Sequence, residues 1–268
     1  MVKATFSDPV AVSDDSLLND FRALGISHGD TLLVHSSLSR IGWVHGGPIA
    51  VIKALQAALG HTGTLVMPAH TSHISEPALW RNPRAPAESI DTIRSTMPAF
   101  DPLVTPSRGM GVIAECLRSQ PGVLRSAHPQ DSFIARGPAA GKITAVHTLD
   151  NGLGEQSPLA RLYELDAKIL LLGVGHDSNT SIHLSENRAN YAGKRQIKNG
   201  APVLVDGKRV WTEFEHLEYN VADFRQIGQA FASQTDATSC SFVGRAQSQL
   251  FPMRRLVDFA VDWINANR

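Results

Sequence analysis

The chain has 268 residues, of which 43% are hydrophobic and 19% are charged, a composition that suits one large domain with a sizeable core. Lys and Arg together number 25, as do Asp and Glu, so the formal net charge is zero. The nearest approach to a basic run is Arg254-Arg255, and we therefore expect no nucleic-acid or polybasic membrane partner. No apolar stretch approaches the roughly 18 to 20 residues of a membrane span.

Two further features indicate a cytoplasmic protein. Met1–Pro9 has no apolar centre and does not read as a secretory signal. Cys116 and Cys240 are the only cysteines, and two thiols so far apart in the sequence are more typical of free thiols in a reducing compartment than of a disulfide framework.

The first part of the chain predicts a β-α-β unit preceded by a helix. Asp15–Leu24 is expected to form the helix, and Thr31–His35 a short buried strand. Pro48–Leu59 repeats apolar residues at helical spacing, with Pro48 suited to the first turn, and Thr64–Met67 is a second strand. A parallel pair of strands joined by a crossover helix follows from this order.

Residues 68–106 have a different character, because seven of the 15 prolines fall here. We expect no continuous regular structure, and a segment of this length in a compact chain is typically a lid or the wall of a binding site. Ser107–Leu117 is then expected to be a helix, capped by Thr105 or Ser107. The following elements are extended pieces at 123–126 and 132–135, helices at 138–146 and 157–165, and a buried strand at 168–174.

A smaller section follows Arg188. Residues 202–211 predict a hairpin that turns at Asp206-Gly207, and residues 219–231 and 251–266 are expected to be helical. Altogether the pattern indicates an α/β protein: a single domain over 1–268 with a core at about 15–190 and a looser C-terminal section at about 191–268.

The segment from Leu170 to Glu186 is the most informative part of the sequence. A buried strand ends in Gly173-Val174-Gly175, and a polar turn then leads into a helix, which is where open α/β sheets place their ligands. His183 and Glu186 are three residues apart, so a helix brings them to one face. An imidazole held by a carboxylate is a suitable general base. The alternative is a capped helix with an incidental His–Glu pair.

Two loops could bind a phosphate group. Val34–Arg40 offers serine hydroxyls and backbone amides after a strand, and Thr105–Gly111 offers amides, glycines and Arg108 at an expected helix start. The glycine spacing matches neither a Walker loop nor a dinucleotide fingerprint. The alternatives are a polar turn whose serines cap the next helix, and a capped helix with glycines for close packing.

The chain has 11 histidines, many of them beside glycine, serine or proline. His70 and His73 form an H-x-x-H pair, but they lie in the proline-rich segment, and neither a cysteine pair nor an H-E-x-x-H motif accompanies them. We therefore expect no metal site. A metal-dependent hydrolase using the histidines remains a weaker alternative.

Taken together, the motifs resemble the aminoglycoside 3-N-acetyltransferase family of antibiotic acetyltransferases. The resemblance rests on segments in family order, which are Leu33–Ser39, Gly63–Pro68, Thr105–Gly111, Arg125–Pro129, Ser157-Pro158 and Leu171–Glu186. It implies a three-layer α/β/α sandwich with a mixed, largely parallel central sheet, unlike the common acetyltransferase fold. It also implies acetyl-CoA as the acetyl donor and an amino group, such as the 3-amino group of an aminoglycoside, as the acceptor.

The resemblance assigns roles to particular residues. His183 would be the catalytic base, Glu186 its partner, and Thr180 or a backbone amide the oxyanion donor. Asp177 would lie near the acceptor. The residues implied at the acetyl-CoA site are His35, Ser36, Ser37, Leu38, Ser39, Ser107, Arg108, Gly109, Met110 and Gly111.

A cationic acceptor calls for carboxylates. Glu213, Glu215 and Glu218 are dense in one segment and could form an acceptor wall, or else a solvated face. Asp91 and Asp101 in the proline-rich segment are a second option. A non-catalytic protein that binds CoA or an antibiotic is the competing function, and a homodimer is an assembly that the sequence leaves open.

Overall fold

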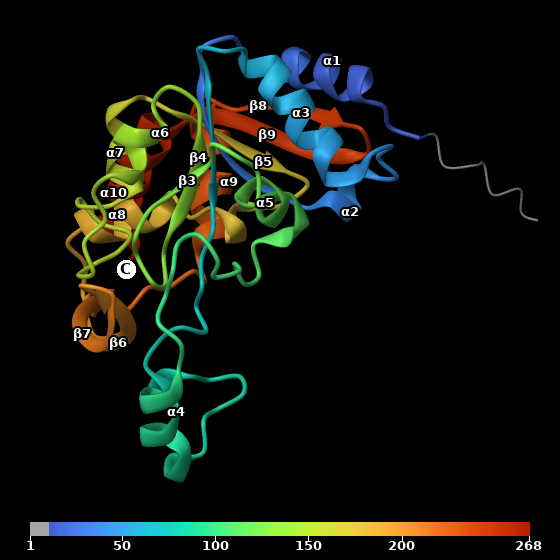
Figure 1. Ribbon diagram of the computed structural model, residues 1–268. Helices are drawn as coiled ribbons and strands as arrows, with labels where there is room; N and C mark the ends of the chain where they lie inside the picture. Colours follow the sequence, from blue (N-terminus) through green and yellow to red (C-terminus); the bar gives the residue numbers. More distant parts are fainter. Residues whose placement is uncertain (1–10) are drawn as a thin grey trace, which may run out of the picture.

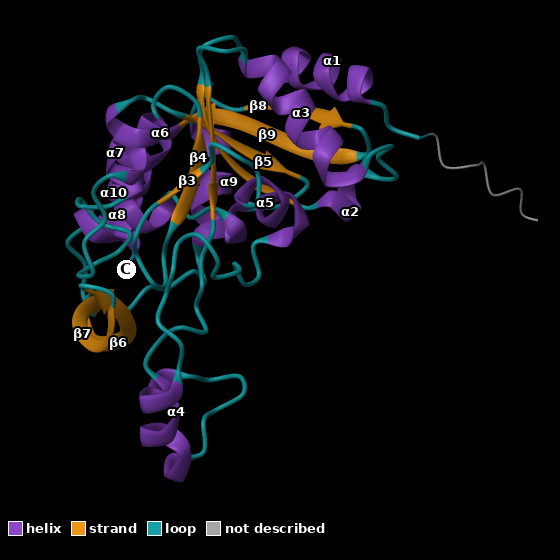
Figure 2. Cartoon of the chain, in the orientation of Figure 1, coloured by secondary structure: helices purple, strands orange, loops and turns teal. Residues whose placement is uncertain are grey.

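A computed structural model describes residues 11–268 and shows a central sheet of seven strands between two layers of helices (Figures 1 and 2). The strand order is β3-β4-β2-β1-β5-β9-β8. The three strands β1 (Thr31–Ser36), β2 (Thr64–Pro68) and β5 (Lys168–Leu172) are parallel to one another at the centre of the sheet. The β-α-β unit expected from the sequence is confirmed, as is the α/β/α architecture.

The sheet is mixed, but the expectation that it is largely parallel was wrong. The flanking strands β3 (Leu124–Arg125), β4 (Phe133–Arg136), β8 (Ser239–Val243) and β9 (Ala246–Pro252) all pair antiparallel with their neighbours. The parallel geometry is thus confined to the centre, where crossover helices cover both faces.

Each face of the sheet has its own helical layer. Along β1, Leu32 and Val34 face one layer while Leu33 faces the other, as the alternation of a strand requires. The first layer contains α1 (Asp14–Leu24), α3 (Gly47–Leu59) and α5 (Gly111–Arg118). The second contains α6 (Ala140–Thr144), α7 (Pro158–Glu164), α8 (Ile182–Arg188), α9 (Phe224–Gln234) and α10 (Met253–Asn267).

Local signals set several helix ends. Ser13 and Ser16 form a capping box at the start of α1, and Gly25 closes it in the left-handed conformation. The expected caps of α5 were wrong, because this helix begins only at Gly111, after Met110, without a side-chain cap. The Ser107 hydroxyl and its backbone N–H instead donate to Glu115 Oε2, at 2.7 Å and 3.0 Å.

Residues 69–108 form an excursion from the sheet that carries η1 (Pro77–Leu79), η2 (Ala87–Ser89) and α4 (Ile90–Thr96) (Figure 1). Its two ends meet, because the Arg108 N–H donates to the His70 carbonyl at 2.8 Å. The Arg125 guanidinium also bonds to the carbonyls of Ala69 and Thr105. The segment thus has short helical pieces and a fixed base.

The excursion packs against a hairpin made of β6 (Gln196–Val205) and β7 (Lys208–Leu217), which is longer than the hairpin expected at 202–211. The turn does fall at Asp206-Gly207. Excursion and hairpin share a small apolar cluster of Ile74, Met97, Phe100, Ala201 and Phe214. The two segments therefore form one unit beside the sheet.

The C-terminal residues belong to the central sheet. Strands β8 and β9 were not foreseen, and β9 pairs with β5 from Lys168↔Pro252 to Leu172↔Ser248. The sheet therefore extends beyond the expected core at 15–190, and α10 begins at Met253 because Phe251 belongs to β9. The expected helix at 219–231 corresponds to α9, which starts at Phe224.

Two other expectations concern the whole chain. Cys116 and Cys240 are free thiols, as expected. Between residues 11 and 268, none of the helices has the length and apolarity needed to cross a membrane. The expectation about a secretory signal rests on Met1–Pro9, which lies outside the described residues.

Candidate active site

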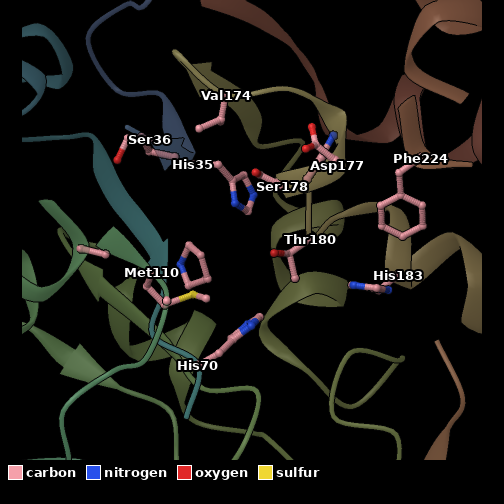
Figure 3. Close-up of a pocket in the computed structure, with 15 residues that line it drawn as sticks. His35, Ser36, His70, Met110, Val174, Asp177, Ser178, Thr180, His183 and Phe224 are labelled. Carbon is pink, nitrogen blue, oxygen red and sulfur yellow. The ribbon is translucent and has the colours of Figure 1, made fainter. Parts of the chain in front are cut away.

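A cavity of about 250 Å³ opens at the carboxyl ends of the parallel strands β1 and β5 (Figure 3). This is the edge at which open α/β sheets bind ligands, because the loops that leave the strands diverge there. Seven of the residues that were given a catalytic, donor or acceptor role from the sequence line this cavity. They are His35, Ser36, Gly109, Met110, Asp177, Thr180 and His183. The cavity therefore joins the two loops and the strand-turn-helix segment that the sequence highlighted.

His183 and Glu186 form the expected pair on α8. His183 Nδ1 lies 2.6 Å from Glu186 Oε2. The imidazole is held between two aromatic rings, with its centroid 4.5 Å from that of Tyr219 and 4.9 Å from that of Phe224. Since Nδ1 is engaged by the carboxylate, Nε2 is the nitrogen available to the cavity.

Glu186 is completely buried, and both of its carboxylate oxygens are bonded. While Oε2 contacts His183, Oε1 accepts from Arg268 Nη1 at 2.6 Å and from the Asn220 N–H at 2.9 Å. The Arg268 guanidinium also bonds to Asp223. A buried carboxylate without such partners would be strongly destabilising, so these contacts stabilise Glu186 and fix it in place.

His35 and His70 line the opposite side of the cavity from His183 (Figure 3). The Nε2 atom of each is buried and has no hydrogen-bond partner among residues 11–268. Burial, together with the smaller effect of the nearby His70, His183 and His176, lowers the pKa of His35 to about 3. Burial also lowers the pKa of His70 to about 4. Both imidazoles are therefore neutral at pH 7 and can donate one hydrogen bond each.

Thr180 precedes α8 and lines the cavity together with Asn179. Its side chain lies between those of His35 and His183 in Figure 3, with the hydroxyl directed into the cavity. A hydroxyl in this position can donate to an oxygen that gains negative charge near His183. The expected oxyanion role of Thr180 stays a prediction.

Only part of the two predicted donor loops reaches the cavity. Of the residues expected to bind acetyl-CoA, His35, Ser36, Gly109 and Met110 line it. Those that do not line it are Ser37, Leu38, Ser39, Ser107, Arg108 and Gly111. The two loops nevertheless lie together, since a Cβ placed on Gly111 would be 3.6 Å from the Ser36 carbonyl oxygen.

Some of these outlying residues have structural contacts instead. The Ser37 hydroxyl lies 3.2 Å from that of Ser39 at the start of α2 (Leu38–Ile41). Although burial opposes it, the hydrogen bonds from Arg118 and Ser107 lower the pKa of Glu115 to about 2. Ser107 thus anchors its loop through a permanently charged carboxylate.

The residues predicted to bind the acceptor differ in whether they reach the cavity. Asp177 lines it. Glu213 and Glu215 lie on β7, where they are exposed and alternate with the buried Phe214, and neither lines the cavity. The structure therefore does not bring these two carboxylates to His183.

Residues 11–268 contain no group of three or more His, Cys, Asp or Glu side chains arranged to hold a metal ion. His70 lines the cavity, whereas His73 does not. The sequence analysis missed the aromatic residues Tyr219 and Phe224 and the cation Arg268, because each reaches the site from a distant part of the chain.

Comparison with known proteins gives the family. A family model described as aminoglycoside 3-N-acetyltransferase matches residues 33–265. The chain belongs to the aminoglycoside 3-N-acetyltransferase family. It is accordingly an acyltransferase of the aminoglycoside N(3)-acetyltransferase type, and the resemblance noted in the sequence is confirmed.

Two curated relatives match over nearly the full chain. The SPbeta prophage-derived aminoglycoside N(3')-acetyltransferase-like protein YokD of Bacillus subtilis (strain 168) is 45% identical, over 100% of this chain and 97% of its own. Aminoglycoside N(3)-acetyltransferase VIII of Streptomyces fradiae is 36% identical, over 95% of this chain and 92% of its own.

Solved structures agree. The crystal structure of YokD matches with a TM-score of 0.93 and 45% identity, covering 96% of this chain and 94% of that one. A binary structure of AAC-IIIb with CoASH matches with a TM-score of 0.86 and 32% identity, covering 96% of this chain and 97% of that one. AAC-VIa bound to sisomicin matches with a TM-score of 0.86 and 32% identity, covering 96% and 98%. Family members therefore share this architecture.

Proposed function

We propose that this protein transfers the acetyl group of acetyl-CoA to an amino group of an aminoglycoside or a similar amine, by direct attack with His183 as general base. The observation that carries the proposal is the 2.6 Å contact between His183 Nδ1 and the buried Glu186, which leaves His183 Nε2 as the proton acceptor in the cavity. For an aminoglycoside, the family name points to the 3-amino group.

The chemistry requires a base, because a protonated amine is not a nucleophile. An ammonium group first releases one proton to solvent. The neutral nitrogen then attacks the thioester carbonyl carbon, His183 Nε2 accepts the second proton as the carbon–nitrogen bond forms, and Glu186 stabilises the resulting imidazolium. A carbon–nitrogen bond forms, the carbon–sulfur bond then breaks, and the CoA thiolate leaves. His183 can return its proton to that thiolate.

The residues around His183 supply the remaining steps. The Thr180 hydroxyl is placed to donate to the oxyanion of the tetrahedral intermediate, and a backbone amide is the alternative donor. The loops that contain Ser36 and Gly109 would hold the donor beside the carbonyl under attack. Neither cysteine lines the cavity, which supports direct transfer without an acetyl-enzyme.

The relatives support both substrates of the proposed reaction. AAC-IIIb has a structure with CoASH, and AAC-VIa has one with sisomicin. Because acetyl-CoA is a cytoplasmic metabolite, the cytoplasm is the proposed location.

The experiment that tests this function is thiol release from acetyl-CoA by the purified protein with sisomicin and a panel of other amines. Release that depends on an amine supports the transferase. Acetyl-CoA binding without release from any amine would favour a non-catalytic binding protein, and activity that is lost on chelation but independent of acetyl-CoA would favour a metal-dependent hydrolase.

A further inference from the structure

A second hollow, of about 820 Å³, lies between residues 77–90 of the excursion and the β6–β7 hairpin. Its charged lining residues are Arg81, Arg84, Arg195 and Glu218. An adjoining hollow of about 790 Å³ shares three of these side chains, Arg81, Arg195 and Glu218. We call the two together the basic cleft, since arginines outnumber carboxylates in both.

The basic cleft lies one side chain away from His183. Tyr219 lines both parts of the cleft, and its ring centroid is 4.5 Å from that of His183. His216 lines the larger part, with its ring centroid 5.0 Å from that of Tyr219. The catalytic cavity and the cleft share no lining residue, so Tyr219 lies between them, and an acceptor that uses both has to extend past this ring.

The predicted donor loops lie elsewhere. No residue of 36–39 or 107–111 lines the basic cleft, whereas Ser36, Gly109 and Met110 line the catalytic cavity. The cleft is thus on the acceptor side of His183, and its charge bears on which amines can bind.

The charge of the cleft does not suit a polycation. Glu218 is the only carboxylate among its lining residues, and it already pairs with Arg81 at 3.4 Å and with Arg195. The hydrogen bond from Arg195 keeps the pKa of Glu218 below its usual range. Burial lowers the pKa of His216, so this imidazole is neutral at pH 7 and adds no charge of either sign to the cleft.

Arg84 differs from the other arginines of the cleft. Within residues 11–268 it has no ion pair or side-chain hydrogen bond, so its guanidinium is free to bind a ligand. A guanidinium fork matches the oxygens of a phosphate or a carboxylate, and such charge-assisted bonds are about twice as strong as neutral ones.

We propose that the natural acceptor is an amine that also carries an oxyanionic group, a phosphate, phosphonate or carboxylate, and that Arg84 binds this group with support from Arg81 and Arg195. This inference rests on the proposed acetyl transfer and specifies its acceptor. The reaction is unchanged: the amine nitrogen gains the acetyl carbon, the carbon–sulfur bond breaks, His183 takes the amine proton, and the oxyanion only binds.

A matched set of amines tests the proposal. We would measure thiol release from acetyl-CoA, and calorimetric binding in the presence of CoA, with glucosamine 6-phosphate, glucosamine and sisomicin. We expect the phosphate to raise kcat/KM and affinity about tenfold or more over glucosamine, and sisomicin to bind more weakly than glucosamine 6-phosphate. Replacing the phosphate by a carboxylate at C6, with 2-amino-2-deoxyglucuronic acid as probe, shows which oxyanion is preferred.

Arginine variants provide the second arm. Arg84→Glu should reduce the advantage of glucosamine 6-phosphate over glucosamine by about tenfold. Arg22→Glu, which reverses the charge of an exposed arginine on α1 that does not line the cleft, is the matched control and should keep that advantage. Because Arg84 is exposed, its replacement should leave the protein folded, which the melting temperature checks.

Three results would overturn the proposal. Glucosamine or sisomicin could be preferred to glucosamine 6-phosphate in both assays. Alternatively, Arg84→Glu could leave the advantage of glucosamine 6-phosphate over glucosamine unchanged. Arg84→Glu could instead weaken the binding of acetyl-CoA, which would assign the cleft to the donor. If no amine causes thiol release, the calorimetric affinities of the three amines decide whether the oxyanionic acceptor is preferred. Loss of acetyl-CoA binding in the wild type would refute the proposed function itself.

Discussion

Arg268 Nη1 lies 2.6 Å from Glu186 Oε1, on the carboxylate whose other oxygen contacts His183. The side chain of Arg268 is only 8% exposed, and that of Glu186 is fully buried. The contacts of Arg268 with Glu186 and of Glu186 with His183 therefore connect the residue after α10 to the cavity. Arg268 does not line the cavity, so it acts on the reaction through Glu186 as a positioning residue.

We predict that Arg268→Gln lowers kcat by about tenfold and the free energy of unfolding by about 3 kcal/mol, because it leaves the buried Glu186 and the partly buried Asp223 without their cation. Steady-state thiol release and a denaturant titration measure the two effects.

Two further variants separate positioning from folding. Arg268→Lys keeps the charge and should restore most of kcat even if stability stays low. Arg255→Gln removes a cation on α10, the helix before Arg268, from its exposed pair with Asp236, and should change little. A normal kcat in folded Arg268→Gln would show that Arg268 is structural only.

We predict that His183→Ala lowers turnover by about 10²-fold or more while acetyl-CoA binding survives, since the base acts on the amine and not on the donor. Steady-state thiol release and calorimetry measure the two quantities. His61→Ala, an exposed histidine outside the cavity, is the control. Turnover that is unchanged in His183→Ala would remove this residue from the mechanism.

The local part of this site could be predicted from the sequence. A spacing of three residues brings His183 and Glu186 to one face whenever their segment is helical, and the apolar strand before it fixes their place at the edge of the sheet. Arg268 is 82 residues beyond Glu186, and no periodicity connects two positions so far apart. Such contacts depend on how α10 packs against α8.

The missed strands have a similar explanation. In β8 the pattern Ser239–Val243 is mostly exposed, as befits an edge strand, and β9 begins with Ala-Gln-Ser-Gln, which lacks an apolar run. Their structure comes from the pairing of β9 with β5 and of β8 with β9 more than from local propensity. The acceptor carboxylates Glu213 and Glu215 were misplaced for a related reason, since a strand alternates and the register decides which face each residue takes.

We predict that Arg125→Met loosens the excursion at 69–108. Burial lowers the pKa of Arg125 to about 10, so it is still charged at pH 7, and its guanidinium bonds to Ala69, Thr105 and Ser132. Its loss removes three hydrogen bonds of a charged donor, although the Ala69 carbonyl keeps the bond from the Ser132 hydroxyl, and should cost about 3 kcal/mol. Limited proteolysis within 69–108 should become faster.

Arg136→Met is the matched control for this variant, because Arg136 is exposed and bonds only to Gln120 among side chains of the described residues. It should leave both the cleavage rate and the stability close to the wild type. Equal cleavage of Arg125→Met and the wild type would mean that the apolar cluster with the hairpin suffices to hold the excursion.

The last prediction concerns pH and stability. Burial lowers the pKa of His35 from 6.5 to about 3, so between these values the unfolded chain binds a proton that the folded protein does not. The free energy of unfolding should therefore fall as the pH drops from 6.5 toward 3, with His35 contributing up to about 1.4 kcal/mol per pH unit. His35→Asn removes this group, so its unfolding free energy should depend less steeply on pH than that of the wild type. Denaturant titrations at pH 7, 6 and 5 measure both slopes. Burial also lowers the pKa of His147, to about 3, so part of the slope should remain in His35→Asn, and identical slopes in both proteins would mean that His35 is not held neutral by the fold.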